Sequence, residues 1–185
     1  MFKDGARYNG IGPWMKEYFG GRTVKLAIDG GFTCPNRDGT LSSDGCIFCS
    51  SSGSGDFTSD RRLSITEQMR AQVEIMSEKW RSARFIAYFQ NYTNTYAPAA
   101  ALTRRYSEAL SFPGCYGLAI ATRPDCLSNE VVALLSDLNK KTFLWVELGL
   151  QTSNDSTAEI INRCCTTSVY DDAVKRLTSA GIRVV

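Results

Sequence analysis

The sequence contains no histidine. That absence excludes Ser-His and Cys-His catalysis, and it removes imidazole as a metal ligand. The sequence also has no run of about 18 apolar residues, which a helix needs to span a bilayer, and its first residues lack the apolar segment of a secretory signal. We therefore expect a cytoplasmic protein with no membrane partner.

The sequence also lacks an excess of charge of one sign, because 21 basic residues nearly balance 19 acidic ones and leave a net charge of +2. This balance gives no electrostatic indication of a nucleic-acid or membrane-surface partner. Cysteine, by contrast, occurs seven times. An odd number of thiols in a chain without an export signal disfavours a disulfide framework and favours metal or redox chemistry.

The 185 residues, 43% of them hydrophobic, are enough to bury one core. Apolar runs of strand length alternate with segments of helical periodicity. The expected strands cover residues 23–31, 84–90, 115–122, 142–150 and 182–185, and the expected helices cover 64–80, 98–110, 128–140, 156–163 and 168–181. Because the strands are almost continuously apolar, this order predicts an α/β fold with a parallel sheet covered by helices.

Capping signals support several of these helices. Ser64 and Glu67 form a capping box at the start of helix 64–80. Ser128 is the expected cap of the next-to-last long helix, and Ser168 with Asp171 is the expected cap of the last one. The apolar residues of helix 64–80 recur every three or four positions and predict one buried stripe: Ile65, Met69, Val73, Met76 and Trp80.

The chain divides into a polar lead-in, residues 1–23, and a core domain, residues 24–185. The sequence stops as the fifth strand opens, which would leave an uncovered pairing edge. We therefore expect a core domain that is truncated at its C-terminal end.

Three of the cysteines, Cys34, Cys46 and Cys49, lie in one Gly-, Ser- and Asp-rich loop after the first strand. Three interpretations compete. A structural zinc site needs four Cys or His ligands, and this loop supplies only three. Buried unliganded thiols fit poorly with such polar neighbours. An iron–sulfur cluster held by three thiolates would keep one iron open for a substrate or cofactor, and this interpretation is favoured.

The segments "GFTCPNRDG", "CIFC", "YFQNYTNTYAP", "ATRPD" and "ELGLQT" resemble, in order and spacing, the radical S-adenosylmethionine (SAM) superfamily. The resemblance is to the branch related to the elongator catalytic subunits. It implies a partial (β/α)6 barrel of which the first four to five β/α units are present. It also implies that Cys34, Cys46 and Cys49 hold a [4Fe-4S] cluster whose open iron binds SAM.

The activity that the resemblance implies is reductive cleavage of SAM to a 5′-deoxyadenosyl radical, which acts on an unknown substrate. The cofactor carries this chemistry and the protein orients it. An electron donor such as flavodoxin or ferredoxin is the implied partner. Kinship with the elongator subunits makes RNA a possible substrate, although the near-neutral chain gives no independent support.

The resemblance also implies roles in SAM binding. Phe48 would lie near the adenine, Gln151 near the ribose and Arg163 near the carboxylate, which the planar guanidinium can pair with both oxygens. Other members have a Gly-Gly-Glu motif after the second strand to receive the SAM amino group. Here the acceptors would be Gln90, Asn91 and Thr93. The structural alternatives are a solvated Arg at a helix end and a plain Asn/Thr-rich turn.

Alternation along the fourth strand places Trp145, Glu147, Gly149 and Gln151 on one face. A carboxylate in an apolar strand needs a hydrogen-bond donor, so this line predicts a polar pocket beside the sheet. The alternative is a structural Glu147 paired with a core arginine.

Two further segments bear on this site. Thr122 joins the expected cofactor-binding residues, because it ends the third strand at the same edge of the sheet, followed by Arg123 and Asp125. Downstream, Cys164 and Cys165 replace the Gly-His pair that is usual in the branch.

The four remaining cysteines have less specific explanations. Cys115 and Cys126 lie beside apolar runs and are expected to be structural, and the adjacent pair Cys164 and Cys165 is expected to be sequence drift. In the alternative function, a non-catalytic zinc-binding module, one of these four would complete the three-cysteine loop as the fourth ligand.

Overall fold

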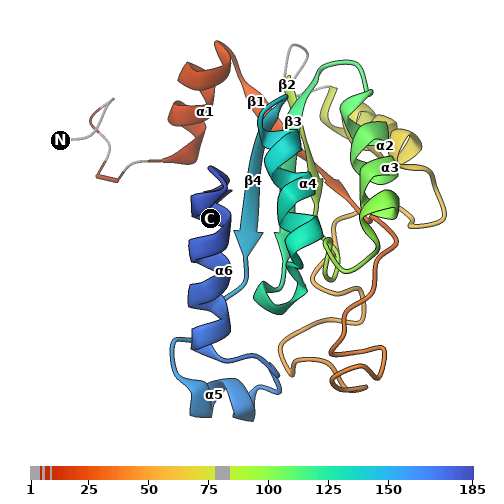
Figure 1. Ribbon diagram of the computed structural model, residues 1–185. Coiled ribbons are helices and arrows are strands. Elements are labelled where there is room, and N and C mark those ends of the chain that lie inside the picture. The colour runs from red at the N-terminus through yellow and green to blue at the C-terminus, as the bar shows by residue number, and fades with distance from the viewer. Residues whose placement is uncertain (1–4, 6, 9, 78–83) are drawn as a thin grey trace.

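The computed structural model describes residues 5, 7–8, 10–77 and 84–185. Figure 1 shows helices alternating with strands along the chain. The strands are β1 (Thr23–Ile28), β2 (Arg84–Phe89), β3 (Cys115–Thr122), β4 (Phe143–Leu148) and β5 (Arg183–Val184). The helices are α1 (Ile11–Phe19), α2 (Ile65–Ser77), α3 (Ala99–Leu110), the short 3-10 turn η2 (Pro124–Cys126), α4 (Asn129–Asn139), α5 (Asp155–Ile160) and α6 (Thr167–Ser179).

The five strands form one sheet in the order β1-β2-β3-β4-β5. Every neighbouring pair is parallel, so the predicted α/β fold with a parallel sheet is confirmed. The spatial order follows the chain order and never reverses, as it would in a doubly wound sheet. This winding is that of an open, partial β/α barrel, and the carboxyl ends of its strands meet at one edge.

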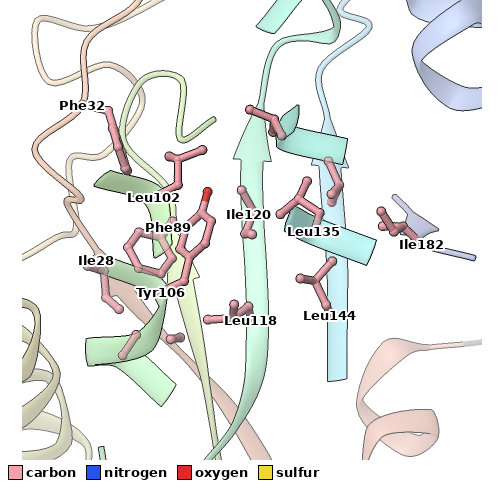
Figure 2. Packing of buried hydrophobic residues seen from close by; sticks show 14 of the residues in the cluster. Ile28, Phe32, Phe89, Leu102, Tyr106, Leu118, Ile120, Leu135, Leu144 and Ile182 are labelled. Carbon is pink, nitrogen blue, oxygen red and sulfur yellow. The ribbon is translucent and has the colours of Figure 1, made fainter. Parts of the chain in front are cut away.

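The main core lies between the helix-covered face of the sheet and the helices (Figure 2). Alternate strand residues point into it, because successive side chains of a strand face opposite sides. Leu118 and Ile120 of β3 and Leu144 of β4 are fully buried there, as is Tyr106 of α3, whose hydroxyl donates to the carbonyl of Asn94 at 2.5 Å. A buried phenol therefore keeps its hydrogen bond while its ring packs against Phe89.

The opposite face of the sheet changes character along the strands. Near the strand starts it is apolar, where Met15 of α1 packs with Ile86, Ala119, Phe143 and Trp145. Toward the carboxyl ends the same face carries polar groups, described with the candidate site below. Helix α1 thus closes the amino-terminal part of this face and leaves the carboxyl-terminal part free for a binding site.

Most of the predicted capping contacts are present. The Ser64 amide donates to the Glu67 carboxylate at 2.8 Å, and Ser128 Oγ accepts the Val131 amide at 3.2 Å. In the predicted stripe of α2, Ile65 and Met69 are buried, and Val73 and Met76 pack against the core. Trp80 lies outside the described residues.

The predicted cap of α6 is wrong. The helix begins at Thr167, one residue before the expected cap Ser168. Its N-cap residue is Thr166, whose side chain makes no capping hydrogen bond. Instead the carboxylate of Asp155, from α5, accepts the Thr167 amide at 2.8 Å. A cap supplied from another helix leaves no local sequence signal.

Gly117 of β3 allows β4 to approach closely. A Cβ atom at this position would lie 2.3 Å from the backbone oxygen of Phe143, so replacement by alanine must push the two strands apart. We expect Gly117→Ala to lower the free energy of unfolding by about 2–3 kcal/mol, measured from urea denaturation followed by circular dichroism.

The matched control is Gly12→Ala, because a Cβ there meets nothing within 4 Å and the residue lies in α1. Alanine is the better helix former, so this variant should be neutral or up to about 1 kcal/mol more stable. Equal destabilisation of both variants would contradict the strand-contact explanation.

Candidate functional site

The three-cysteine loop folds by turns at the carboxyl end of β1. The carbonyl of Cys34 accepts hydrogen bonds from the amides of Arg37 and Asp38 at 2.8 and 3.1 Å. The Cys49 amide donates to the carbonyl of Cys46 at 3.0 Å. Gly39 and Gly45 have φ of 90° and 75°, a backbone conformation that favours glycine. The loop therefore folds back on itself, and its ends hold the thiols.

The thiols of this loop border one cavity of about 400 Å³ at the carboxyl edge of the sheet. The loop lies below the sheet, where the strand arrows end (Figure 1). The cavity also touches most of the residues that the sequence predicted for SAM binding, which come from five separate segments: Phe48, Gln90, Thr93, Thr122, Glu147, Gln151 and Arg163.

Asn91 is the predicted site residue that does not border this cavity. Its side chain is buried and donates to Asp29 Oδ2 at 2.9 Å and to the carbonyl of Ser52 at 3.2 Å. The alternation of side chains along an extended chain turns Asn91 away from the side that Gln90 occupies. In this arrangement Asn91 supports the loop over residues 52–55.

Backbone strain concentrates around the cavity. Among the described residues, five non-glycine residues have positive φ. Ser54, Tyr92 and Gln151 border the cavity, and Asn162 and Cys164 flank Arg163. Such conformations cost roughly 1–3 kcal/mol each and persist where the surroundings enforce them, commonly at functional sites.

Arg163 brings a buried positive charge to the cavity. The residue is 5% exposed, and its guanidinium donates to the carbonyl of Gly149 at 2.7 Å. Among the residues that the structure describes, no carboxylate forms an ion pair with it. A buried cation that has only neutral acceptors is costly unless an anion joins it. Arg163 is therefore suited to receive an anionic ligand.

Arg123 borders the same cavity but is already paired. Its guanidinium makes two hydrogen bonds to the Asp125 carboxylate, at 2.8 and 2.7 Å, and one to the carbonyl of Arg163 at 3.1 Å. Burial opposes its charge, yet these contacts with Asp125 raise the pKa of Arg123. The third guanidinium nitrogen, Nη1, is buried with no partner among the described residues.

Glu147 lies on the sheet face opposite the main core, near the polar carboxyl ends of the strands. Its carboxylate accepts Lys25 Nζ at 2.8 Å and Trp145 Nε1 at 3.0 Å. Burial alone would raise the pKa of Glu147, but the hydrogen bond from Lys25, with others from Tyr88 and Trp145, lowers it below its usual value. The expected line of polar residues on β4 is present, and the partner of Glu147 is a lysine rather than an arginine.

The four remaining cysteines do not border this cavity. Burial and the Asp125 carboxylate raise the pKa of Cys126 to about 12, and burial also raises the pKa of Cys115 and Cys165. A high thiol pKa disfavours the thiolate that a metal requires. Within the described ranges, no three His, Cys, Asp or Glu side chains are arranged to hold a single metal ion. The four ligands of a zinc site are therefore not assembled.

The donor set does fit an iron–sulfur cluster. Its ligands bind different irons and so need not converge on one point, and thiolates are the usual ligands. Arg37 and Arg163 border the cavity with carbonyl partners, and their charge would balance an anionic cluster. Glycines at positions 45, 53 and 149 also border the cavity, and each lets a neighbouring side chain, that of Arg37, Tyr92 or Gln151, approach the backbone closely.

Sequence reasoning missed several residues of the site. Tyr88 lies two positions before Gln90 and shares its face, so alternation along β2 could have identified it. Asn36 and Arg37 gave no such signal, because their contacts depend on how the irregular loop folds.

A family model described as the radical SAM superfamily matches residues 33–185. The chain belongs to the radical SAM superfamily. Among its relatives are the uncharacterized protein YtqA of Bacillus subtilis (strain 168), 46% identical over 96% of this chain, and protein YhcC of Escherichia coli (strain K12), 37% identical over 95%. This chain spans 55% and 56% of their lengths, respectively.

A solved structure supports the fold. The cobalamin-dependent S-adenosylmethionine radical enzyme OxsB, with aqua-cobalamin bound, superimposes with a TM-score of 0.55 over 91% of this chain and 24% of its own. At 14% identity this likeness establishes the partial barrel of the radical SAM type and nothing about the ligands. Over the described part of the radical SAM chain, no helix has the length and apolar character to cross a membrane.

The Lys25–Glu147 pair makes stability depend on pH. Because the pKa of Glu147 is lower in the folded state, the carboxylate stabilises the fold above its ordinary value near 4.5, and this contribution is lost as the pH falls through the lowered value. We expect Lys25→Met to cost about 0.5–1 kcal/mol in urea unfolding at pH 7 and much less at pH 3.

Lys140→Met is the control, since Lys140 and Asp137 form a pair that is 70% and 67% exposed. It should change stability less than Lys25→Met at pH 7. A loss in Lys25→Met that is equal at both pH values would argue against the ion pair as its cause.

Proposed function

We propose that this chain binds a [4Fe-4S] cluster through Cys34, Cys46 and Cys49 and binds SAM in the adjoining cavity. The observation that carries the proposal is that three thiols and the buried Arg163, which has no carboxylate partner among the described residues, border one cavity at the carboxyl edge of a partial barrel. That edge is where β/α barrels hold their ligands. Thiolates would bind the irons, and the guanidinium would pair with a carboxylate.

With cluster and SAM bound, the chemistry supplied is one-electron cleavage of SAM to methionine and a 5′-deoxyadenosyl radical. The chain itself binds and orients. Phe48 borders the cavity and is 50% exposed, so its ring offers an apolar surface for the flat adenine. Gln151 is held in a left-handed conformation at the cavity wall, and its amide would contact the ribose.

The amino group of SAM needs acceptors. Gln90 and Thr93 supply oxygens at the cavity, and the proposed contribution of Asn91 would be indirect, through the loop that it supports. Thr122 and Glu147 complete the polar wall. Since Lys25 already neutralises Glu147, this carboxylate acts as a hydrogen-bond acceptor rather than a free charge.

A one-electron donor such as flavodoxin or ferredoxin is the proposed partner, because reductive cleavage consumes an electron. We propose a cytoplasmic location and a division into a lead-in, residues 1–23, and a core domain, residues 24–185. Membership of the elongator-related branch and an RNA substrate stay predictions that rest on sequence resemblance. The activity of the whole protein is part of the same proposal.

Cysteine substitution tests the cluster. After anaerobic reconstitution we expect about four iron and four sulfide per chain, and Cys46→Ala should lose most of both, because two thiolates and no histidine remain to hold the irons. Cys115→Ala is the control, since Cys115 lies in β3 away from the cavity and should leave the iron and sulfide content unchanged. One zinc and no sulfide in the unchanged protein would replace the proposal with a zinc module.

Substitution of Arg163 tests the SAM site. Arg163→Met keeps the length of the side chain but removes the charge that would pair with the SAM carboxylate. We expect SAM affinity, measured by calorimetry on the reconstituted protein, to fall about 10- to 100-fold, as for a lost charge-assisted hydrogen bond. Arg62→Met is the control, because Arg62 is exposed, pairs with Asp60 and does not border the cavity. Unchanged affinity in Arg163→Met would remove Arg163 from the site.

A further inference from the structure

The side chain of Asn36 is fully buried at the base of the three-cysteine loop. Its Nδ2 donates to the carbonyl of Asn162 at 2.5 Å and to Cys46 Sγ at 3.4 Å. The first bond fixes the orientation of the amide, because the flipped amide would place an oxygen against a carbonyl oxygen. The second N–H is therefore directed at the sulfur.

This donor is held in place from several sides. The Asn36 carbonyl accepts the Gly45 amide at 2.7 Å, which closes the loop next to Cys46. Asn162 in turn donates from its side chain to the carbonyl of Gly45 at 2.7 Å, and the Ile47 amide donates to the carbonyl of Ile161 at 3.2 Å. The turn before Arg163 and the segment around Cys46 are thus joined directly by these two bonds and again through Asn36.

Cys49 has a weaker contact of this kind, and no hydrogen bond to Cys34 Sγ is present among the described residues. Cys49 Sγ lies 3.6 Å from Ser54 Oγ, a hydroxyl that can either donate or accept and that is solvent-exposed. An amide N–H can only donate, and water cannot replace it at a fully buried position. Among the described residues, Asn36 is accordingly the buried side-chain donor to a ligand sulfur of this loop.

We propose that Asn36 is a positioning residue that holds Cys46 in place and raises the reduction potential of the cluster through its hydrogen bond to the sulfur. The inference rests on the proposed cluster. Reduction adds negative charge to the cluster and its sulfur ligands, and a donor stabilises the more negative state. Removing the donor should therefore make the cluster harder to reduce.

The test compares Asn36→Leu with the unchanged protein, both reconstituted anaerobically with iron and sulfide. The measurement is a potentiometric titration with dithionite and mediators, followed by electron paramagnetic resonance, alongside iron and sulfide analysis. At the potential where the unchanged protein is half reduced, we expect the ratio of reduced to oxidised cluster in Asn36→Leu to be about tenfold lower. For a one-electron couple this is a shift of about 59 mV to lower potential.

The matched control is Asn94→Leu. Asn94 is also fully buried, donates to two carbonyls, those of Phe89 and Ala121, at 3.0 and 2.9 Å, and likewise has an unpartnered Oδ1 among the described residues. No contact to a sulfur is among its hydrogen bonds. This variant should lose a similar amount of stability and keep the potential of the unchanged protein.

The outcomes separate this inference from the proposed function. If the unchanged protein assembles no cluster, both fail. If it does, and Asn36→Leu has the same iron content and the same potential, the inference alone is overturned. Loss of the cluster from a folded Asn36→Leu, with Asn94→Leu still loaded, supports the positioning role. If Asn36→Leu does not fold, the smaller Asn36→Ser is measured instead, and unfolding of both Asn36 variants alone would overturn the inference.

Discussion

The site depends on hydrogen bonds that hold an irregular loop in one conformation. Residues 34–49 contain no helix or strand, so neither a ladder nor a helical repeat positions the thiols. Asn36 does so from inside the loop, and Arg37 does so from its side by donating to the carbonyls of Cys49 and Ser50. Because Asn162 completes the network, the place of Arg163 in the cavity is tied to the place of the cysteines.

The loop lies at the carboxyl edge of the sheet. The sheet face opposite the main core differs between its two ends. At the amino end, α1 covers the face with apolar contacts centred on Met15 and Phe143. At the carboxyl end, Tyr88 and Glu147 border the cavity. Stability and binding are thus separated along the strands, an arrangement typical of β/α barrels. A substitution near α1 should act on folding, and one near the carboxyl edge on ligands.

Much of the fold could be predicted from sequence, because apolar runs and helical periodicity are local. Every predicted strand and long helix is present, and alternation along β4 placed Glu147 and Gln151 on one side. Contacts between distant segments could not be predicted. Asp155 caps α6 and Asn36 reaches Asn162, and neither contact follows from spacing. Asn91 shows the same limit, because its side chain joins Asp29 instead of the cavity.

Solvent exposure is unevenly distributed along the cysteine loop, and this bears on how the loop can change in length. Residues 38–41 form an exposed tip, and a side chain at Gly39 would meet nothing within 4 Å. Extra residues inserted there would lengthen a solvent-exposed turn at small entropic cost. The base, with Asn36, Arg37 and Gly45, has no such freedom. Related proteins could therefore differ in the distance between their first two cysteines while keeping the three sulfur atoms in register.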